Sequence, residues 1–517
     1  MRPGKERRAA LAASLAFVGA LLAPHGAAVA EEPGRYELTV DGIGLDGAPA
    51  GDDWSVVVQN VDTGETSYLD DEAGTGTVEV PAGDYLVTSD MGWIGTESAM
   101  DLTVQTRTLP ELAADTAITF DARRAEEIDL SVFDRAAEQT TLTLVTVLTR
   151  GDGYTSTTFW NTFEGADSTF RTQHTGPSLG EGGLRSVAAA SWLNPDTGTE
   201  YHAAHERTGT FFTGLDEHER RRDLARVDLG ARALAGGARG RLHFLYELVH
   251  DGHFAERELP GTTTAYLTPG RWGYGLDVTE AGGDSLSFEG ALERYAAGER
   301  RRVEVGAPVF GPGLGARDGL SREGDEIAVG VGLFSDDQGN RGAAGGWESA
   351  SVVVRRDGEV YATSDRPLNR TWIEVPPEEA EYELTTTVRR DAAALVSTEV
   401  TASFTFASGH AGTSTELPMS VVRFTPRLGE GGTVPAGRRT VVPVTVQGTA
   451  AAEGGPSALS VEVSHDRGDT WRSVQVRDGA VAVDNPAAGG TVSFRAHLTD
   501  RGGNTTELTV VDAYRTV

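Results

Sequence analysis

The chain has 517 residues, a formal net charge of −32 and no cysteine. Single hydrophobic cores stop growing near about 250 to 300 residues, so this length predicts several domains. Hydrophobic residues make up 39% of the chain and aromatic residues 7%, which is enough for packed cores and excludes wholesale disorder. The lack of cysteine excludes a disulfide framework, a thiolate zinc site and a cysteine nucleophile. The acidic balance disfavours nucleic acid as a partner, because such a surface repels phosphate.

The first 30 residues have the pattern of a secretory signal peptide. Basic residues lie between Arg2 and Arg8, an apolar run covers 9–22, and the small residues at 28–30 form a cleavage site. The mature chain is therefore expected to begin at Glu31 and to be secreted. No later stretch approaches the roughly 20 apolar residues that a bilayer requires, so we expect no membrane insertion after cleavage.

The N-terminal part of the mature chain has the alternation of short β-strands. Turn residues separate these strands, which predicts a small sandwich over 35–120. The stretch 78–85 (VEVPAGDY) is typical of the late hairpin of transthyretin-like or immunoglobulin-like modules, and a change of composition at 121–127 marks the first boundary. The predicted strands cover 37–40, 54–58, 77–80 and 85–88.

The central part has longer strands with more aromatic residues. Residues 216–235 are ambiguous there, because 217–226 has the charge of an exposed helix while Ala225, Val227 and Leu229 alternate as in a strand. We favour a strand. The other predicted strands of this part are 141–148, 184–192, 240–249, 263–267 and 272–278.

The C-terminal half is predicted to continue in the same way. A third sandwich over 310–426 contains a hairpin that turns on Asp357 and Gly358. The fold class is therefore all-β, a string of antiparallel β-sandwich modules of immunoglobulin-like or transthyretin-like type. The predicted organisation is a signal peptide at 1–30, a β-sandwich at 31–125, a larger central β domain at 126–308, a β-sandwich at 309–426 and an immunoglobulin-like sandwich at 427–517.

Three short motifs suggest peptidase chemistry. Residues 62–64 and 196–198 both read Asp-Thr-Gly, as in the paired carboxylates of aspartic peptidases, but turn residues precede both triplets and hairpin turns explain them. Ser414 lies in a Gly-Thr-Ser triplet like the serine turn of subtilisin-like peptidases. Residues 415–418 (TELP) do not favour the helix that such a serine requires, so we nominate no catalytic residue.

Two histidine pairs and one acidic loop have the residue types that bind metal ions. His202 and His205, like His250 and His253, are three residues apart, a spacing that shares a face on a helix but not on a strand. Both pairs lie in strand-like segments, so surface or loop histidines are favoured. The oxygen-rich loop 336–340 (DDQGN) could ligate calcium, and a solvated turn is its alternative. No cofactor is expected, and any metal stays unknown.

Residues 464–471 (SHDRGDTW) match the pattern S-x-D-x-G-x-T-W of an Asp box. Asp466 can bond backbone amides across the turn, and Gly468 permits a positive φ. The motif predicts a folded hairpin and carries no catalytic role.

Several segments taken together resemble a known secreted region. In order and spacing they are similar, from about residue 35 onward, to the region that follows the catalytic domain in large subtilisin-like serine peptidases (subtilases) of high-GC Gram-positive bacteria. The catalytic Asp, His and Ser segments of that family are absent from this sequence, so the resemblance implies a non-catalytic accessory region. The segments include 120–125 (FDARRA), 266–270 (YLTPG), 404–409 (FTFASG), 417–424 (LPMSVVRF) and 492–496 (VSFRA).

These observations predict a secreted, non-enzymatic, multidomain β protein that binds an extracellular polymer or protein partner through loops at the sandwich ends. A hydrolase in the central region is one alternative, which a pocket joining His202, His250 and Asp251 would favour. A structural partner of a separately encoded serine peptidase is another. The aromatic residues that could line a central cleft, or fill a core instead, are Trp160, Trp192, Tyr201, Trp272 and Tyr274.

Overall fold

A computed structural model describes residues 34–72, 74–94, 99–162, 167–180, 182–234, 237–247, 249–250, 255–368, 370–429 and 431–517. The predicted signal peptide lies outside these residues and stays a prediction. Nearly every described element is a β-strand, which confirms the all-β class; the helical elements described are the 3-10 turn η1 (Ala122–Arg124) and the single turn α1 (Thr449–Ala452). The described part of the chain contains no helix with the length and apolar character needed to cross a membrane.

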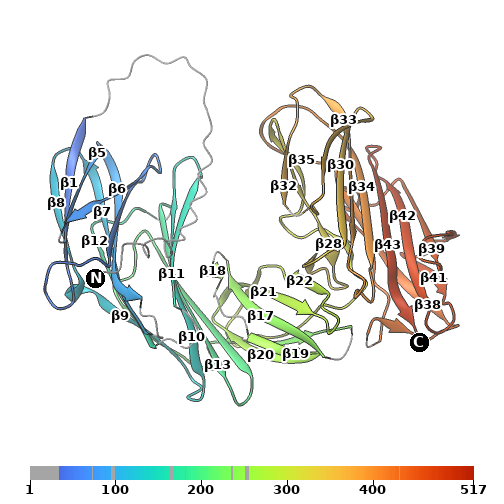
Figure 1. Cartoon of the computed structure of the whole chain (residues 1–517), viewed down its shortest axis with the longest axis horizontal. Helices are drawn as coiled ribbons and strands as arrows, with labels where there is room; N and C mark the ends of the chain where they lie inside the picture. Colours follow the sequence, from blue (N-terminus) through green and yellow to red (C-terminus); the bar gives the residue numbers. More distant parts are fainter. Residues whose placement is uncertain are drawn as a thin grey trace, which may run out of the picture. The chain divides into compact units, whose positions relative to one another are not determined.

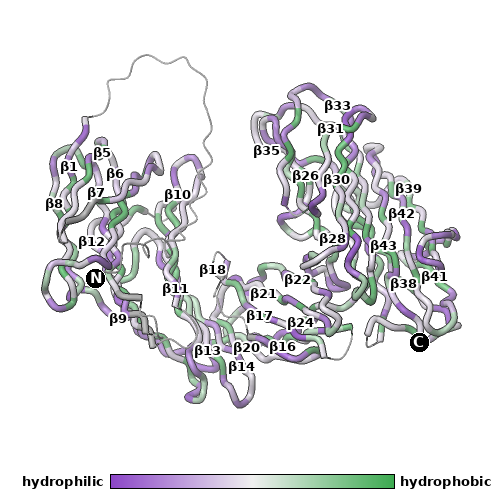
Figure 2. Tube along the Cα trace, in the orientation of Figure 1, coloured by the Kyte–Doolittle hydropathy of each residue, from purple (hydrophilic) through white to green (hydrophobic). Residues whose placement is uncertain are grey.

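The described residues form two compact units, one that ends at Leu224 and one that begins at Ala225. This division falls inside the predicted central segment 126–308. Figure 1 shows the strands of each unit, and Figure 2 shows hydrophobic and hydrophilic residues alternating along them. Such alternation is expected where one face of a sheet is buried and the other faces water.

The first unit begins with a β-sandwich. One sheet has the strand order β4 (Asp70–Glu72), β5 (Thr75–Pro81), β1 (Arg35–Ile43) and β8 (Thr116–Asp121). The other has the order β15 (Leu215–Glu219), β9 (Glu126–Val132), β12 (Asp167–Thr175), β7 (Ala99–Leu112), β6 (Gly83–Ile94), β2 (Trp54–Asn60) and β3 (Thr66–Tyr68). Leu38 and Val40 of β1 pack against Trp54 of β2 and Val87 of β6 in a shared hydrophobic core.

The stretch 78–85 is not a hairpin. Val78 lies in β5, which pairs with β1 and β4, whereas Tyr85 lies in β6, which pairs with β2 and β7. The turn between them therefore carries the chain from one sheet of the sandwich to the other. The sequence prediction of a hairpin was wrong here because two strands around a tight turn can cross the core instead of pairing.

A second ladder completes the first unit. Its strands are antiparallel and run in the order β11 (Thr155–Asn161), β10 (Glu138–Thr149), β13 (Leu184–Asn194) and β14 (Thr199–Thr208). The turns at 62–64 and 196–198 lie in hairpins, as predicted: the side chain of Asn60 accepts from the Asp62 and Thr63 amides, and Asn194 does the same for the second turn.

Two strands form within the ambiguous segment 216–235, as favoured, and a turn at 220–224 separates them. The segment contributes β15 to the first unit and β16 (Ala225–Ala231) to the second. In β16 the residues Ala225, Val227 and Leu229 are buried, while Arg226 and Asp228 between them are partly exposed and paired with each other. The alternation of apolar residues thus predicted the structure of 225–229 correctly, whereas the helix-like charge pattern of 217–226 did not.

The second unit begins with two groups of paired strands. β16 pairs with β20 (Gly261–Leu267) and, in parallel, with β24 (Arg300–Val305). The other group has the order β18 (Val249–His250), β17 (Ala238–Tyr246), β21 (Gly270–Thr279), β22 (Ser285–Glu289) and β29 (Arg341–Ala344), with β19 (Ala255–Leu259) on β17 and β23 (Glu293–Tyr295) on β21.

A long sheet runs through the rest of the second unit (Figure 1). Its predicted hairpin forms, with positive φ at both Asp357 and Gly358. The strand order is β31 (Glu359–Ser364), β30 (Ser349–Arg356), β33 (Ala380–Arg389), β34 (Glu399–Ser408), β43 (Thr505–Thr516), β42 (Thr491–Thr499), β39 (Ala458–Ser464) and β40 (Arg472–Val474), with β37 (Thr433–Val434) beside β43.

Three smaller sheets complete the second unit. β36 (Ser420–Phe424), β38 (Arg439–Gly448) and β41 (Ala480–Asp484) form one, and Phe424 of this sheet stacks on Phe494 of β42 with ring centroids 4.3 Å apart. β25 (Gly311–Gly313) pairs with β28 (Gly332–Ser335). The third has the order β32 (Thr371–Glu374), β27 (Glu326–Gly330), β26 (Gly319–Gly324) and β35 (Ala411–Leu417).

Strand pairs cross the three predicted boundaries between the β modules. β7 and β12 pair across the boundary at 125/126, β22 and β29 across 308/309, and β34 and β43 across 426/427. The predicted modules therefore share sheets with their neighbours in the chain. Most pairs are antiparallel; parallel pairs include β1–β8, β7–β12, β9–β15, β16–β24 and β37–β43.

Candidate functional site

The first unit contains a serine, a histidine and a glutamate in a hydrogen-bonded row. Ser191 of β13 is the cross-strand partner of His202 of β14, and its Oγ lies 2.8 Å from His202 Nδ1. The Nε2 atom of the same imidazole lies 3.1 Å from Glu200 Oε2. Glu200 precedes His202 by two residues in one strand, so the three side chains share a face of the sheet.

This row has the residue types of a catalytic triad but not its access to substrate. The exposed fractions of Ser191, His202 and Glu200 are 0%, 1% and 0%. A nucleophile must reach a substrate carbonyl beside donors for the developing oxyanion, and a sealed hydroxyl cannot do so. The row is better explained as a satisfied polar network inside the first unit.

Of the three residues that a hydrolase pocket would join, His202 is the one whose side chain the structure describes. His205 points to the opposite face of β14 from His202 and pairs with Glu219 at 2.9 Å. Asp251, His253 and the side chain of His250 lie outside the described residues. Of the central aromatic residues, Trp192, Tyr201, Trp272 and Tyr274 are buried, which favours the alternative of core filling.

The acidic loop 336–340 is organised by its own hydrogen bonds. Asp336 is buried, and its Oδ1 accepts from the Gln338 and Asn340 amides at 3.1 and 2.9 Å. Its Oδ2 accepts from the Gly306 amide and the Asn340 side chain at 2.8 and 2.7 Å. These bonds occupy both carboxylate oxygens of Asp336, and the described residues contain no group of three or more histidine or acidic side chains placed to hold a metal ion.

Two other motifs have structural roles. Ser414 lies in the exposed strand β35 and opens no helix. The Asp box forms the turn between β39 and β40, where Asp466 accepts from the Ser464 hydroxyl at 2.6 Å and from the Thr470 amide at 2.9 Å. These hydrogen bonds to Ser464 and Thr470 lower the pKa of Asp466 to about 2.

The best candidate for a binding site is a groove of about 810 Å³ in the second unit. Its lining comes from the sheet β32-β27-β26-β35, from the segment 314–318 that precedes β26, and from α1. The volume falls in the range of about 300 to 1,000 Å³ that small-molecule sites occupy. The groove contains an exposed tryptophan, Trp372, whose exposed fraction is 66%.

The register of the sheet places one residue of each strand in a single row across the groove. Trp372 of β32 faces Ala328 of β27, Ala328 faces Ser321 of β26, and Ser321 faces Glu416 of β35. Directly opposed residues share a face of an antiparallel sheet, so all four side chains lie on the groove side. With three interstrand gaps, the row spans about 14 Å.

Small residues form the floor of the groove. Beside Ala328 and Ser321, the next row on the same face pairs Gly330 with Gly319, and a Cβ atom at Gly319 would meet nothing within 4 Å. The residues between them on β26 and β27 point the other way; Leu320, Ile327 and Val329 are buried in the core. The two central strands thus have an apolar inner face and an outer face of small residues. The larger side chains of Trp372 and Glu416 flank this outer face at the edges of the sheet.

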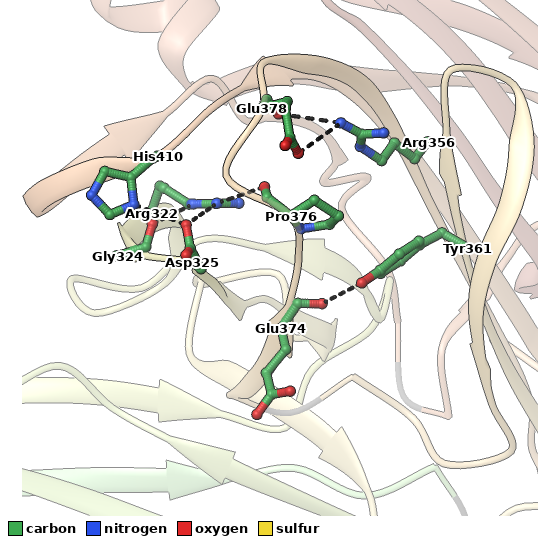
Figure 3. Close-up of polar contacts among 9 residues, drawn as sticks. All are labelled: Arg322, Gly324, Asp325, Arg356, Tyr361, Glu374, Pro376, Glu378 and His410. Carbon is green, nitrogen blue, oxygen red and sulfur yellow. Dashed lines mark hydrogen bonds and ion pairs between the residues drawn. The ribbon is translucent and has the colours of Figure 1, made fainter. Parts of the chain in front are cut away.

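A polar cluster anchors the hairpin and the edge strand that carry this face (Figure 3). Arg322 is buried on the inner side, and its guanidinium donates to the carbonyls of Gly324 at 2.8 Å and Pro376 at 3.0 Å. The first bond holds the β26–β27 turn, and the second holds the segment that follows β32. The cluster therefore fixes the strand that presents Trp372.

Further contacts in Figure 3 hold the rim of the same region. Asp325 accepts from Arg322 at 3.1 Å and from His410 Nδ1 at 2.9 Å, and the bond from His410 is the main reason that the pKa of Asp325 is lowered. The Tyr361 hydroxyl donates to the Glu374 carbonyl at 3.2 Å.

Charged side chains of both signs lie around the groove, and three carboxylates lie beyond it toward the β26–β27 turn. Arg370 and Glu416 both line it, and Arg370 also lies 3.8 Å from Glu289. Toward the β26–β27 turn, Glu326 is the cross-strand partner of both Glu323 and Glu374, which places three carboxylates in one row. Opposed like charges repel each other and any anion that approaches this end.

Comparisons with known proteins identify no family for the chain. No protein-family model and no curated protein matches it. Among solved structures, the Bacillus anthracis TIE protein is 13% identical over 52% of this chain and 50% of its own, with a TM-score of 0.13. Sidekick-1 immunoglobulin domains 1–4 are 12% identical over 74% and 96%, with a TM-score of 0.15. Chicken CNTN1 domains FN1–FN3 are 11% identical over 63% and 94%, with a TM-score of 0.12.

The chain thus spans half the length of the first of these structures, and likeness of this degree says nothing of function. The fold class rests on the strands and their pairing in the chain itself. The resemblance to subtilase accessory regions stays a prediction.

The sequence prediction did not single out Trp372. Its signal was present but weak: a lone tryptophan in the short stretch 371–374 (TWIE), two residues after Arg370 and two before Glu374. Its partners Ala328, Ser321 and Glu416 come from strands up to 95 residues apart, and nothing local in the sequence sets the register that aligns them.

Proposed function

We propose that the protein is exported and acts as a non-catalytic binding protein that holds an extracellular polymer or protein partner. The groove beside Trp372 is the observation that carries this proposal. An exposed tryptophan on a sheet face leaves a large apolar surface in water, and such surfaces on soluble proteins commonly mark contact sites. The floor of small residues leaves room for a ligand, and the charged side chains at the edges supply polar groups that can fix its orientation.

The signal-like N-terminus, the acidic composition and the resemblance to a subtilase accessory region support export and a role outside the cell. The sealed state of Ser191, His202 and Glu200 supports a non-catalytic role, because this triad-like row has no route to substrate. Service as a partner of a separately encoded serine peptidase would be a special case of binding a protein.

A retention assay tests the proposal. The mature chain is incubated with insoluble cellulose, chitin, xylan and peptidoglycan and with immobilised collagen and fibronectin, beside the double variant Trp372→Ala, Glu416→Ala. We expect at least one material to retain the wild type and not the variant. Retention by none of them, or turnover of casein or ester substrates that a serine-directed reagent blocks, would contradict the proposal.

A further inference from the structure

We infer that the groove binds a neutral polysaccharide chain, with one sugar ring stacked on Trp372 and hydroxyl groups bonded by the charged and polar side chains beside it. This inference rests on the proposed function and names the chemical class of its ligand. Four observations support it: the exposed ring of Trp372, the polar edges, the paired floor strands and the distribution of charge.

The first step concerns the tryptophan. The face of an indole ring carries the negative part of its quadrupole, and it attracts groups with positively polarised hydrogens. One face of a pyranose ring presents such C–H groups, while its rim carries hydroxyls. Trp372 is 66% exposed on the groove side of the sheet, so its ring is available for this contact.

The second step concerns the groups that meet the hydroxyls. Glu416 is exposed at the opposite edge of the row that begins at Trp372, and Ser321 lies between them. A carboxylate accepts two hydrogen bonds in one plane, and a guanidinium such as that of Arg370 donates two. Such planar pairs match the adjacent hydroxyls of a sugar.

The third step argues against a peptide in the same place. A peptide gains affinity on a sheet mainly by adding a strand to a free edge. The floor strands β26 and β27 are each paired on both sides, β26 with β27 and β35, and β27 with β26 and β32. Their backbone groups are used in the sheet, so recognition on the groove floor falls to side chains. The free edges of this sheet belong to β32 and β35, and a peptide that added a strand at either edge would not lie across the floor.

The fourth step concerns charge. The row of Glu323, Glu326 and Glu374 lies on the groove side of the sheet, beyond the row that begins at Trp372 and toward the β26–β27 turn, and the chain as a whole carries a formal net charge of −32. An acidic polysaccharide would be repelled on approach. A neutral chain avoids this cost and still uses every hydrogen-bonding group at the edges.

Calorimetric titration of the full mature chain tests the inference. The probes are cellohexaose, xylohexaose, mannohexaose and chitohexaose, with hexagalacturonic acid as an anionic comparison and a threonine-rich heptapeptide as a peptide comparison. We expect at least one neutral hexaose to bind, and Trp372→Ala to weaken that binding by at least about tenfold. Glu416→Gln should weaken it as well, with its shape retained and its charge removed.

Trp347→Ala is the matched control. Trp347 is also exposed, at 42%, in the same unit, but it lines a different and smaller cavity of about 200 Å³. Its replacement should leave binding unchanged. Unchanged circular dichroism and melting temperature for Trp372→Ala would show that the variant is folded.

Several results would overturn the inference: no neutral hexaose binds, binding survives Trp372→Ala, or the acidic hexamer or the peptide binds in the groove in preference to the neutral sugars. The two proposals can fail separately. If collagen or fibronectin retains the protein through Trp372 while no hexaose binds, the proposed function stands and the saccharide inference falls. If nothing retains the protein, both fall.

Discussion

Ser191 Oγ lies 2.8 Å from His202 Nδ1 across the β13–β14 pair, with both side chains enclosed in the first unit. A serine and a histidine at this distance are a familiar arrangement in hydrolases, but this pair is buried and cannot reach a substrate. The bond satisfies two buried polar groups in a strand pair that is otherwise rich in alanine, with Glu200 as the second partner of the ring. We therefore interpret the Ser191–His202 hydrogen bond as a contribution to the stability of the fold.

Replacement of Ser191 by alanine tests that interpretation. The change leaves part of the buried network of His202 without its partner, and we expect a loss of about 1 to 3 kcal/mol in the free energy of unfolding. A urea titration followed by circular dichroism measures the loss. A fluorophosphonate probe should label neither the wild type nor the variant. Labelling of the wild type that disappears in Ser191→Ala would show that the serine is reactive and accessible.

The buried ion pair of Asp284 and Arg390 should be costly to break from one side. Both side chains are enclosed, and Arg390 Nε donates to Asp284 Oδ1 at 3.2 Å and Nη1 to the Val396 carbonyl at 2.9 Å. Asp284→Ala leaves an uncompensated charge, and we expect a loss of about 3 to 5 kcal/mol in stability. The double variant Asp284→Leu, Arg390→Met should recover much of that loss.

Urea titrations of the wild type, of Asp284→Ala and of the double variant measure the two losses. The exposed pair of Arg439 and Asp484 serves as the control, and Asp484→Ala should change stability little. Equal losses for Asp284→Ala and for the double variant would show that the charge left behind is not the source of the cost.

Asp336 and Asp466 should titrate far apart although both lie in turns of the second unit. Burial raises the pKa of Asp336 from 3.8 to about 6, while hydrogen bonds from Ser464 and Thr470 lower the pKa of Asp466 to about 2. Carboxyl-carbon NMR titration of aspartate-labelled protein, assigned with Asp336→Asn and Asp466→Asn, gives both midpoints. A midpoint near 3.8 for Asp336 would contradict the prediction.

The raised pKa also fixes the sign of a pH effect. Between about pH 4 and pH 6 the folded protein keeps a proton on Asp336 that the unfolded chain releases. The free energy that this group contributes to folding therefore decreases as the pH rises through that window. An increase with pH in the wild type relative to Asp336→Asn would contradict this sign.

Arg322 should act as an anchor for the groove. Its buried guanidinium bonds the carbonyls of Gly324 and Pro376, and Arg322→Met removes these charge-assisted bonds, for a loss of about 3 kcal/mol. Hydrogen exchange should accelerate at the β26–β27 turn and in β32. His410→Ala is the control, because the His410–Asp325 pair is exposed and should add little. Unchanged exchange in Arg322→Met would show that the turn does not depend on this anchor.

The sequence by itself determined the all-β class and many of the turns. Strand periodicity and turn chemistry are local, so 216–235 could be favoured as strand, and the turns at Asp62, Asp196 and Asp357 could be placed from a few neighbouring residues. The same locality explains the Asp box, whose bonds join residues at most four apart within 464–470.

Pairing between distant strands was decided by the tertiary structure. Local patterns could not show that Val78 and Tyr85 lie in different sheets, or that β34 and β43 pair across a predicted boundary. The groove depends on the same kind of information, since Trp372, Ser321 and Glu416 become neighbours through the registers of three strand pairs. Register depends on which faces are buried together, and that is a property of the packed fold and not of any one segment.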